Sequence, residues 1–426
     1  MRRRTWVALA LCATAALALA VVGVTSAAHS SRDGAAKASL ATPTIRGRGG
    51  LAAATAKGKP ILIGAAVDLT KNMAPFDAPA LAAAQIEIKK INAHGGVLGR
   101  PLQIIPINDQ LDPTRTQQAA AQLVAKHVAI GWVTCDVDYS TPSIDEFLKA
   151  KLLTVAPCIG TDEMGPSRFG SPGKTAFSFG NAAQDEGAAV AEYSISRGWK
   201  NATVVTDNLL RYFQDVCKAF TVRFTQLGGK VLAQESFKQG DKTIGNIVSR
   251  VNSQSPKPQV IAFCTSFAGD QPAFVSGLRS LGNETPIIDG WASDGNYWWP
   301  TSPKVMNFYF LTYASALARD PQAPVRAFEA KLKAAGHPAQ TGGFITGADT
   351  IDAIAYAIRK AHGSTNGATL ANILAHLHKF QTLGGPISFS PGLHSVTGRP
   401  YRVVLVNNNA AKVVGLHTTK VVANIH

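Results

Sequence analysis

Two aspartates and a cysteine follow a short apolar run in the stretch IGWVTCDVDYSTPS, residues 130–143. The run IGWV is typical of a buried strand, and Cys135, Asp136 and Asp138 come soon after it. Carboxylates and hydroxyls at the end of such a strand could hold a small polar ligand. Alternatively they form a solvated turn, in which Ser140 or Thr141 caps the next helix and both aspartates face water.

The sequence offers no recognisable catalytic group. It contains neither GxSxG nor HExxH, and none of its ten histidines lies in a catalytic arrangement, so we expect no enzyme. It also contains no CxxC or HxxxH spacing, the usual signatures of a protein metal site. We therefore expect neither a metal site nor a cofactor.

The composition is that of a globular protein with more than one core. A chain of 426 residues with 46% hydrophobic and 16% charged residues is long enough for two domains. Its formal charge is +15, and +12 once the three arginines at positions 2–4 are removed with an export signal. Because the basic residues do not cluster with aromatics and no zinc-finger spacing occurs, we expect no nucleic-acid partner. Nonspecific adhesion to anionic envelope polymers is the favoured interpretation of the charge.

The first 28 residues have the form of an export signal. Three arginines precede an apolar run from Trp6 to Val24, and small residues follow, with cleavage expected near Ala27 or Ala28. An uncleaved membrane anchor is the alternative. Residues 29–58 are rich in Ala, Gly, Ser and Thr and predict a flexible linker. We expect an exported protein in the periplasm or at the outer face of the cell membrane or cell wall.

From residue 59 onward, short apolar runs alternate with helical patterns. PILIGAAVDL predicts a buried strand, and DAPALAAAQIEIKKINAHGG predicts a helix that ends at Gly95 and Gly96. This alternation continues through LLTVAPC, then restarts at NATVVTDN and runs to TPIIDG. Repeated strand–helix–strand units predict an α/β fold of two doubly wound parallel-sheet lobes with a cleft between them.

The last third of the sequence predicts returns of the chain between the lobes. The strand NFYFLTYAS precedes two helices and a β-rich end. We expect residues 59–178 and 312–384 to form the first lobe, and residues 179–311 and 385–426 the second. Three connections between lobes would form a hinge.

Three stretches resemble a known family. INAHGGVLGRPLQIIPINDQLDP looks like the INAxGGxxGxxL…DDxxDP signature of type I periplasmic solute-binding proteins of the branched-chain amino acid (leucine/isoleucine/valine) class. LLTVAPCIGTDEM is similar to that family's GILxISPxATxxEL, and TGADTIDAIAYAI to its second signature helix. The resemblance covers residues from about 59 to the C-terminus. It implies a cleft that closes over a small ligand, which is then delivered to the permease of an ABC transporter.

The resemblance also implies ligand contacts in the first lobe. In the family, the turn after the third strand offers hydroxyl and N–H groups to a ligand carboxylate. That turn corresponds here to residues 135–141, so Asp136 or Val137 takes the place of the family's serine, with Tyr139 nearby. Phe76, in MAPFDAP, corresponds to an aromatic side chain over the ligand. A second turn, in APCIGTDEM, places ligand contacts at Gly160 and Thr161.

In the second lobe the resemblance implies aromatic contacts. TDNLLRYFQD and FCTSFAGD place cleft aromatics at Tyr212 and Phe267. Amino-acid binders carry an acid for the ligand ammonium in the stretch that here reads IIDGWASDGNYWWP, where Trp291 stands with Asp289 beside it. The alternative is that these aromatics belong to the core, and that Thr161 caps a helix.

These departures from the family pattern change the expected ligand. An aspartate in place of the serine would repel a carboxylate, and Trp291 in place of an acid removes the usual ammonium partner. Asp136, Asp138 or Asp289 could replace that partner. Aromatic rings with nearby carboxylates suit a cationic or neutral polar ligand, so a branched-chain amino acid is only one candidate.

Four cysteines lie outside the export signal, and an even number in an exported chain favours two disulfides. Cys135 and Cys158 follow strands that should be neighbours in the first lobe, while Cys217 lies on a helix and Cys264 ends a strand in the second. We expect these two pairs, because each bond then stays within one lobe and leaves the hinge free.

The sequence therefore predicts a monomeric solute-binding protein of an ABC importer that captures an amino acid, an amide or a related solute. The alternative is a ligand-sensing domain that acts through a membrane receptor partner.

Overall fold

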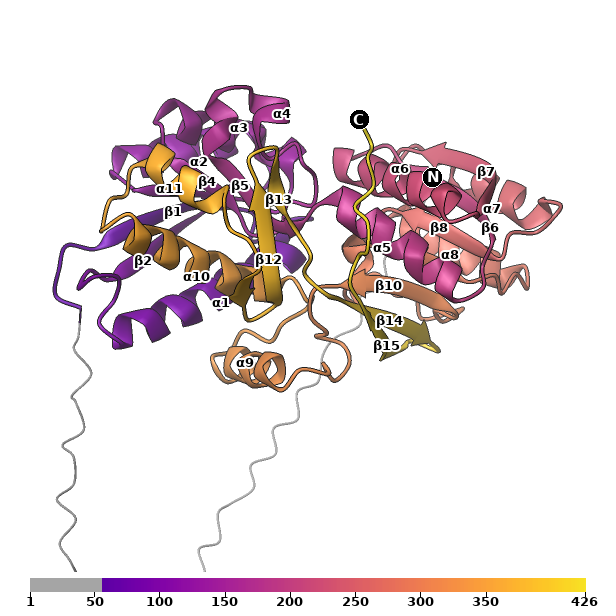
Figure 1. Cartoon of the computed structure of the whole chain (residues 1–426). Coiled ribbons are helices and arrows are strands. Elements are labelled where there is room, and N and C mark those ends of the chain that lie inside the picture. The colour runs from indigo at the N-terminus through magenta and orange to yellow at the C-terminus, as the bar shows by residue number, and fades with distance from the viewer. Residues whose placement is uncertain (1–55) are drawn as a thin grey trace, which may run out of the picture. The chain divides into compact units, whose positions relative to one another are not determined.

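The computed structural model describes residues 56–426. The predicted export signal and most of the predicted linker lie outside these described residues. Two lobes, each built on one β-sheet with helices on both of its faces, make up the described chain (Figure 1). This is the predicted α/β architecture.

The first sheet has eight strands in the order β11-β12-β13-β5-β4-β3-β1-β2. Six of its strands, from β13 to the edge strand β2, are parallel, and β3 and β4 are buried at every position because helices cover both faces. The strands are β1 (Ile61–Val67), β2 (Leu102–Asn108), β3 (Ile130–Val133), β4 (Leu153–Ala156), β5 (Ala176–Asn181), β11 (Phe380–Thr382), β12 (Gly385–Ser390) and β13 (Leu393–Thr397).

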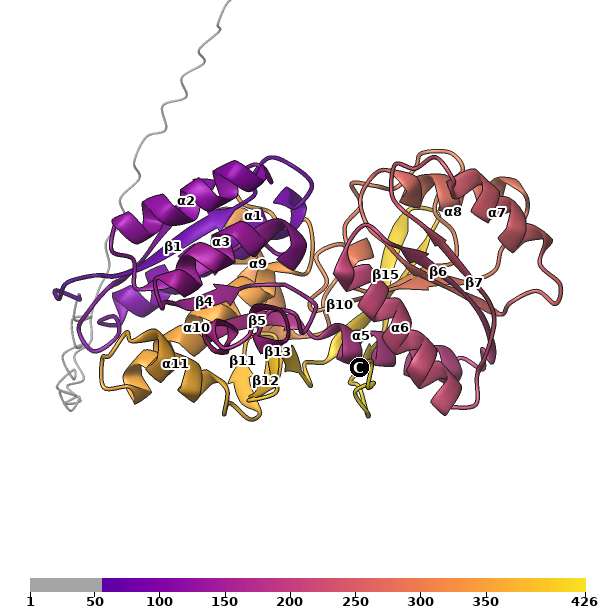
Figure 2. The same cartoon turned by 90° about the horizontal axis from the view of Figure 1, so that it is seen from above.

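Two helix layers cover this sheet, one above and one below it in Figure 1, and Figure 2 looks down on the upper layer. α1 and α10 pack together on one face through aliphatic side chains such as Ile88 and Ile354. α2 and α3 pack on the other face through Leu123 and Phe147. The helices of this lobe are α1 (Ala74–Ala93), α2 (Pro113–Ala125), α3 (Val137–Lys149), α4 (Pro166–Phe169), η1 (Pro172–Thr175), α9 (Ala323–Ala334), α10 (Phe344–Lys360) and α11 (Gly367–Leu374).

The second sheet has seven strands in the order β15-β14-β10-β9-β8-β6-β7. α5 and α6 pack together on one side and α7 and α8 on the other. The strands are β6 (Asn201–Asp207), β7 (Lys230–Phe237), β8 (Val260–Cys264), β9 (Ile287–Asp289), β10 (Phe308–Thr312), β14 (Tyr401–Asn407) and β15 (Ala410–His417). The helices are α5 (Ala183–Ser196), α6 (Arg211–Gln226), α7 (Ile244–Ser253), α8 (Asp270–Ser280) and η2 (Trp291–Ser293).

The chain crosses between the lobes three times: after β5, after β10 and after β13. The predicted last crossing at Gly385 is wrong, because β12 and β13 pair in the first sheet, with β13 beside β5. Residues 385–397 therefore belong to the first lobe, and the chain passes to β14 only after Thr397. The first crossing likewise falls after Asn181, not after residue 178. These boundaries depend on pairing between strands far apart in sequence, which a local pattern does not contain.

Helix α3 begins earlier than the sequence pattern suggests. The pattern placed its start near Thr141, but α3 starts at Val137 with Pro142 inside it. The reason is the side chain of Asp136, which accepts hydrogen bonds from the backbone N–H groups of Asp138 and Tyr139 and so caps the helix. The interpretation of this stretch as a solvated turn is wrong, because Asp136 is only 4% exposed.

After β15 the chain runs along α5. Thr419 Oγ1 donates to the backbone carbonyl of Asp185 at 2.9 Å, and the side chains of Ala423 and Ile425 are buried. Among the helices of residues 56–426, none has the length and apolar character needed to cross a membrane.

Candidate ligand-binding site

A cavity lies where loops of both lobes meet. The first lobe lines it with residues that follow β1, β3 and β4: Met73, Phe76, Cys135, Asp136, Cys158 and Gly160. The second lobe lines it with residues that follow β6, β8 and β9, chiefly Leu210, Tyr212, Phe213, Ser266, Phe267 and Trp291. All six loops leave the carboxyl ends of parallel strands, the edge at which open α/β sheets bind ligands.

The cavity is small. Its volume is about 30 Å³, which is room for about two water molecules. The lining side chains are mainly aromatic and aliphatic. A solute of amino-acid size would therefore fit only if the two walls moved apart, and it would then meet mainly apolar side chains and a few polar groups.

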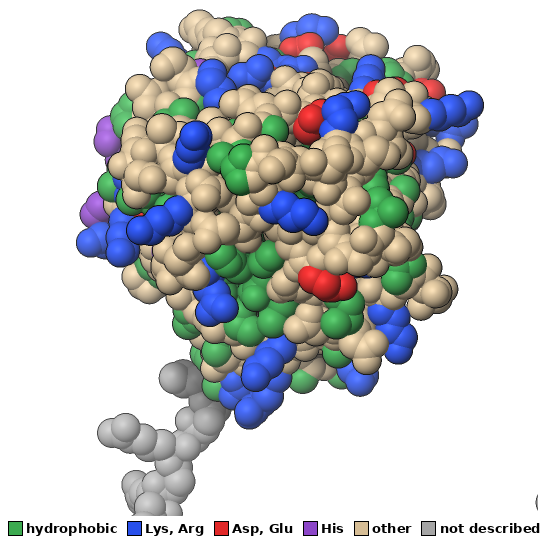
Figure 3. Space-filling view, turned by 90° about the vertical axis from the view of Figure 1, so that its right-hand side faces the viewer, with side chains coloured by type: hydrophobic (Ala, Val, Ile, Leu, Met, Phe, Trp, Pro, Cys, Tyr) green, Lys and Arg blue, Asp and Glu red, His purple; other side chains and the backbone are tan. Residues whose placement is uncertain are grey.

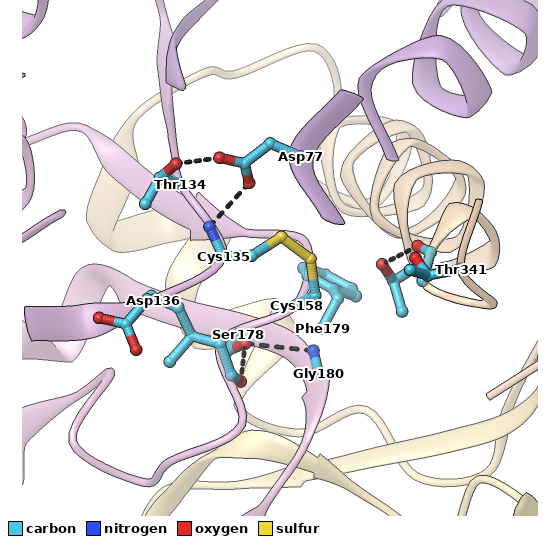
Figure 4. The surroundings of a disulfide bond; sticks show 12 residues. Asp77, Thr134, Cys135, Asp136, Cys158, Ser178, Phe179, Gly180 and Thr341 are labelled. Carbon is cyan, nitrogen blue, oxygen red and sulfur yellow. Dashed lines mark hydrogen bonds between the residues drawn. A yellow bond between two sulfur atoms is a disulfide. The ribbon is translucent and has the colours of Figure 1, made fainter. Parts of the chain in front are cut away.

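A disulfide between Cys135 and Cys158 forms part of the first-lobe wall, with the two Cα atoms 4.7 Å apart. It joins the loops after β3 and β4 (Figure 4). The second predicted disulfide, Cys217–Cys264, is also present, with Cα atoms 5.8 Å apart, and joins α6 to the end of β8. Both predicted pairings are confirmed.

The buried carboxylate of Asp77 supports the loop that carries Cys135. Its Oδ1 accepts a hydrogen bond from Cys135 N at 2.8 Å, and its Oδ2 accepts from the Thr134 hydroxyl (Figure 4). Asp77 Oδ2 also accepts from Asp68 N at 3.0 Å. Burial raises the pKa of Asp77 well above its ordinary value, although these hydrogen bonds oppose the shift. Asp77 therefore ties the loops after β1 and β3 together.

Asp77, Cys135 and Cys158 also place three potential metal-ligand atoms within 4.8 Å of one another. Both sulfur atoms belong to the disulfide, however, so neither is available as a thiolate ligand. This group therefore does not form a metal site.

Aromatic rings form the second-lobe wall and meet Phe76 from the first lobe. The Phe76 and Trp291 ring centroids are 4.9 Å apart in an edge-to-face arrangement, and Trp291 stacks on Tyr313 at 5.0 Å. Tyr212 and Phe267 flank Phe213 at 5.7 and 6.3 Å. These side chains present ring faces and edges to the cavity and few polar atoms.

A second buried carboxylate, that of Glu186 on α5, lies behind this aromatic wall. Its Oε1 accepts hydrogen bonds from the Tyr212 hydroxyl at 2.5 Å and from the backbone N–H of Trp291. Its Oε2 accepts from the Tyr313 hydroxyl at 3.4 Å. Burial raises the pKa of Glu186 to about 7, and the hydrogen bonds partly offset that effect.

Asp136 also has an elevated pKa. Burial raises it to about 7, the charge of Asp138 adds to the shift, and the two N–H groups that the carboxylate caps oppose it. Across the described part of the chain, no Lys, Arg or His side chain lines the cavity. The cavity therefore contains no counter-charge for an anionic ligand.

Six of the ten ligand contacts implied by the sequence line this cavity: Phe76, Asp136, Gly160, Tyr212, Phe267 and Trp291. The other four do not. Val137 is buried in the core between β3 and α3, and Tyr139 is half-buried on α3 outside the cavity lining.

Thr161 and Asp289 lie beside the cavity and are occupied by other contacts. The Thr161 hydroxyl donates to Asp215 Oδ2 at 2.9 Å, a contact from the first lobe to the second. Asp289 is 3% exposed and accepts hydrogen bonds from the Ser293 hydroxyl at 2.5 Å and from the backbone N–H of Thr265 at 3.4 Å. It therefore supports the second-lobe loops from behind.

The lobes approach each other closely at Gly160. A Cβ atom at this position would overlap the ring of Tyr212 from the second lobe. Beside it, Arg211 N donates to Asp138 Oδ2 at 2.9 Å, and Arg211 Nε lies 3.3 Å from Glu163 Oε1. A polar contact between the lobes thus borders the cavity.

Other residues of the site carry no clear signal in the sequence. Met73 and Phe213 look like ordinary core residues, and Asp77 and Glu186 each lie in a helix rich in alanine. A usable signal was the placement of both acids in the first turn of an alanine-rich helix, since an acid buried there needs hydrogen-bond partners.

The basic residues of the second lobe are dispersed over its outer face. Figure 3 shows Lys and Arg side chains spread among neutral and apolar ones on this side. Lys218, Lys230 and Lys257 are among the exposed basic residues of this lobe. The face drawn in Figure 3 thus has no single basic groove of the kind that tracks a nucleic-acid backbone.

Residues 60–411 match the model of the periplasmic binding protein family, and the chain belongs to this family. No sequence among the curated proteins matches it. Similar solved structures include the branched-chain amino acid transporter substrate binding protein LivJ from Streptococcus pneumoniae in complex with isoleucine. It is 19% identical with a TM-score of 0.71, covering 84% of this chain and 99% of that one.

Two proteins from Rhodopseudomonas palustris are also similar. A solute binding protein of an ABC transporter in complex with 3,4-dihydroxy benzoic acid is 18% identical with a TM-score of 0.69, covering 86% of this chain and 98% of that one. Another, in complex with 4-hydroxybenzoate, is 14% identical with a TM-score of 0.71, covering 85% and 98%. These likenesses show the two-lobed fold of type I periplasmic binding proteins.

Proposed function

We propose that this protein captures a small polar solute outside the cytoplasm, in the cavity between its lobes, and delivers it to the permease of an ABC importer. The solute is an amino acid, an amide or a related cationic or neutral molecule. The observation that carries the proposal is the convergence of six strand-end loops, three from each lobe, on one cavity. The work of such a protein is binding and release, with no chemical step.

Closure of the lobes links binding to delivery. A ligand that contacts both walls stabilises the closed arrangement, and a permease that recognises this arrangement then selects the loaded protein. The family match and the solute-binding proteins among the similar structures support this proposal.

Thermal-shift screening of the mature protein tests the proposal. Amino acids, amides, polyamines, sugars and small aromatic acids should be compared at the same concentration. We expect one chemical class to raise the melting temperature, because a ligand that binds only the folded state stabilises it. The same solute should reduce the radius of gyration in solution scattering. The absence of any stabilising solute would contradict the proposal.

A further inference from the structure

Two groups of hydrogen-bond donors at the cavity that would suit a ligand carboxylate are already occupied by carboxylates of the protein. The first such place is the N-terminus of α3, where free backbone N–H groups and the helix dipole favour an anion. Asp136 Oδ1 takes the N–H of Asp138 at 2.9 Å and the N–H of Tyr139 at 3.0 Å. A ligand carboxylate would have to displace this side chain.

The second place is the aromatic wall. The Tyr212 hydroxyl and the Trp291 backbone N–H both donate to Glu186, which is fully buried. The Ser266 hydroxyl donates to the carbonyl of Ala292 at 2.8 Å. A ligand carboxylate at either place would therefore meet occupied donors and an acidic side chain, and no Lys, Arg or His among the described residues lines the cavity to compensate its charge.

One buried side-chain donor of a cavity-lining residue has no partner within the described chain. The indole Nε1–H of Trp291 is buried, and within residues 56–426 it has no hydrogen-bond partner. The Trp291 side chain is 4% exposed and lines the cavity. A buried donor without a partner is costly, so an acceptor atom of a ligand at this position would be favourable.

We infer that the ligand carries no carboxylate, and that it is a small aromatic or aliphatic molecule whose acceptor atom takes the Trp291 indole hydrogen. This inference rests on the proposed function and narrows its ligand class. It separates this chain from its structural neighbours, since isoleucine, 3,4-dihydroxy benzoic acid and 4-hydroxybenzoate each carry a carboxyl group. A primary amide has the required acceptor and nearly the shape of the corresponding acid.

Matched acid and amide pairs test the inference. The probes are benzoate with benzamide, 4-hydroxybenzoate with 4-hydroxybenzamide, and isoleucine with isoleucinamide, measured by thermal shift and titration calorimetry. We expect at least one amide to bind, and to bind at least about tenfold more tightly than its acid. Equal or tighter binding of the acids would overturn the inference and leave the proposed function standing. If none of the six probes bound, the inference would fall, whereas the proposed function would be decided by the broader thermal-shift screen.

Asp136 could exclude a ligand carboxylate in two ways: its side chain occupies the N–H groups at the start of α3, and it carries a negative charge. Two variants of Asp136 distinguish these effects. Asp136→Gly frees the N–H groups of α3, whereas Asp136→Asn keeps an oxygen that caps them and removes only the charge. We expect the affinity ratio of acid to amide to rise at least about tenfold in Asp136→Gly and clearly less in Asp136→Asn. An unchanged ratio in Asp136→Gly, or equal gains in both variants, would contradict the role of the occupied helix end.

The indole hydrogen bond has a matched control. Trp291→Phe keeps an aromatic ring and removes the donor, so amide affinity should fall about fivefold. Trp299 also has a buried indole N–H without a partner in the described chain, but it lies outside the cavity lining. Trp299→Phe should leave amide affinity unchanged. Equal effects of the two substitutions would remove Trp291 from the proposed contact.

Discussion

The two lobes place their disulfides differently. Cys135–Cys158 of the first lobe joins two loops, and both of its cysteines line the cavity. Cys217–Cys264 of the second lobe joins a helix to a strand, and neither of its cysteines lines the cavity. The first bond therefore holds a ligand-facing wall together, while the second fastens layers of a core. Loss of either bond should therefore lower stability, but only loss of the first-lobe bond should weaken ligand binding strongly.

Removal of the second-lobe disulfide should have the largest effect on stability. The cysteines are 47 residues apart, and for a loop of that length chain entropy predicts a loss of about 4 kcal/mol in the free energy of unfolding. Denaturant unfolding of Cys217→Ala/Cys264→Ala measures this loss. Ligand affinity should stay within about twofold of wild type, since the bond lies outside the cavity wall.

Removal of the first-lobe disulfide should cost slightly less stability and far more affinity. The cysteines are 23 residues apart, which predicts a loss of about 3 kcal/mol. Because the loops after β3 and β4 then lose their link, calorimetry should show ligand binding by Cys135→Ala/Cys158→Ala to be at least about tenfold weaker. Equal ligand affinities of the two double variants would contradict the claim that only the first-lobe disulfide supports the cavity wall.

Each lobe also has a buried acid at the cavity whose titration should lower stability as pH rises. Burial raises the pKa of Asp136 and of Glu186 to about 7, above the value of an unfolded chain. Between the unfolded and folded pKa values the folded state binds the extra proton, so stability is highest at low pH and falls as pH rises toward 7. From pH 5 to pH 7 each group should cost about 2 kcal/mol.

The neutral variants Asp136→Asn and Glu186→Gln keep the hydrogen-bond acceptors and remove this titration. Unfolding free energies at pH 5 and pH 7 should therefore differ less in each variant than in wild type. Other buried acids also make the unfolding free energy of wild type depend on pH. The quantity to compare is therefore the difference in this pH dependence between each variant and wild type. If the unfolding free energy of both variants changed with pH as much as that of wild type, Asp136 and Glu186 would not be the groups responsible.

The polar contact between the lobes should have the smallest effect. The Arg211 side chain is 36% exposed and pairs with Glu163 and Asp215 at 3.3 and 2.9 Å. Because exposed ion pairs contribute about 1 kcal/mol or less, Arg211→Ala should change stability by no more than that. Solution scattering of the ligand-free protein should show a slightly larger radius of gyration, whereas Arg250→Ala, which removes an ion pair within the second lobe, should not.

The sequence predicts the two lobes well because central parallel strands are buried on both faces and stand out as apolar runs. It misplaces the last crossing because β12 and β13 are short, partly exposed strands, and β13 finds its partner β5 more than two hundred positions earlier in the chain. That pairing is a tertiary property, and no local pattern carries it.

The sequence predicts the site residues whose contact with the cavity depends on their position in a loop after a strand. It predicts less well those residues whose role depends on a hydrogen bond to a distant part of the chain. Phe76, Tyr212, Phe267 and Trp291 line the cavity because each lies in a loop or first helical turn after a strand. The role of Asp136 as a cap was missed, since Pro142 suggested a later helix start. Glu186 was missed because its burial depends on packing between α5 and three distant aromatic or loop residues.

The most direct test of a ligand site between the lobes uses Gly160. A Cβ at Gly160 would overlap Tyr212 and hold the walls apart, whereas a Cβ at Gly392, in the turn between β12 and β13, would meet nothing within 4 Å. Calorimetry should compare Gly160→Ala and Gly392→Ala with the solute that stabilises wild type most. We predict at least about tenfold weaker binding by Gly160→Ala and unchanged binding by Gly392→Ala. Wild-type affinity in Gly160→Ala would contradict a site that needs this close approach.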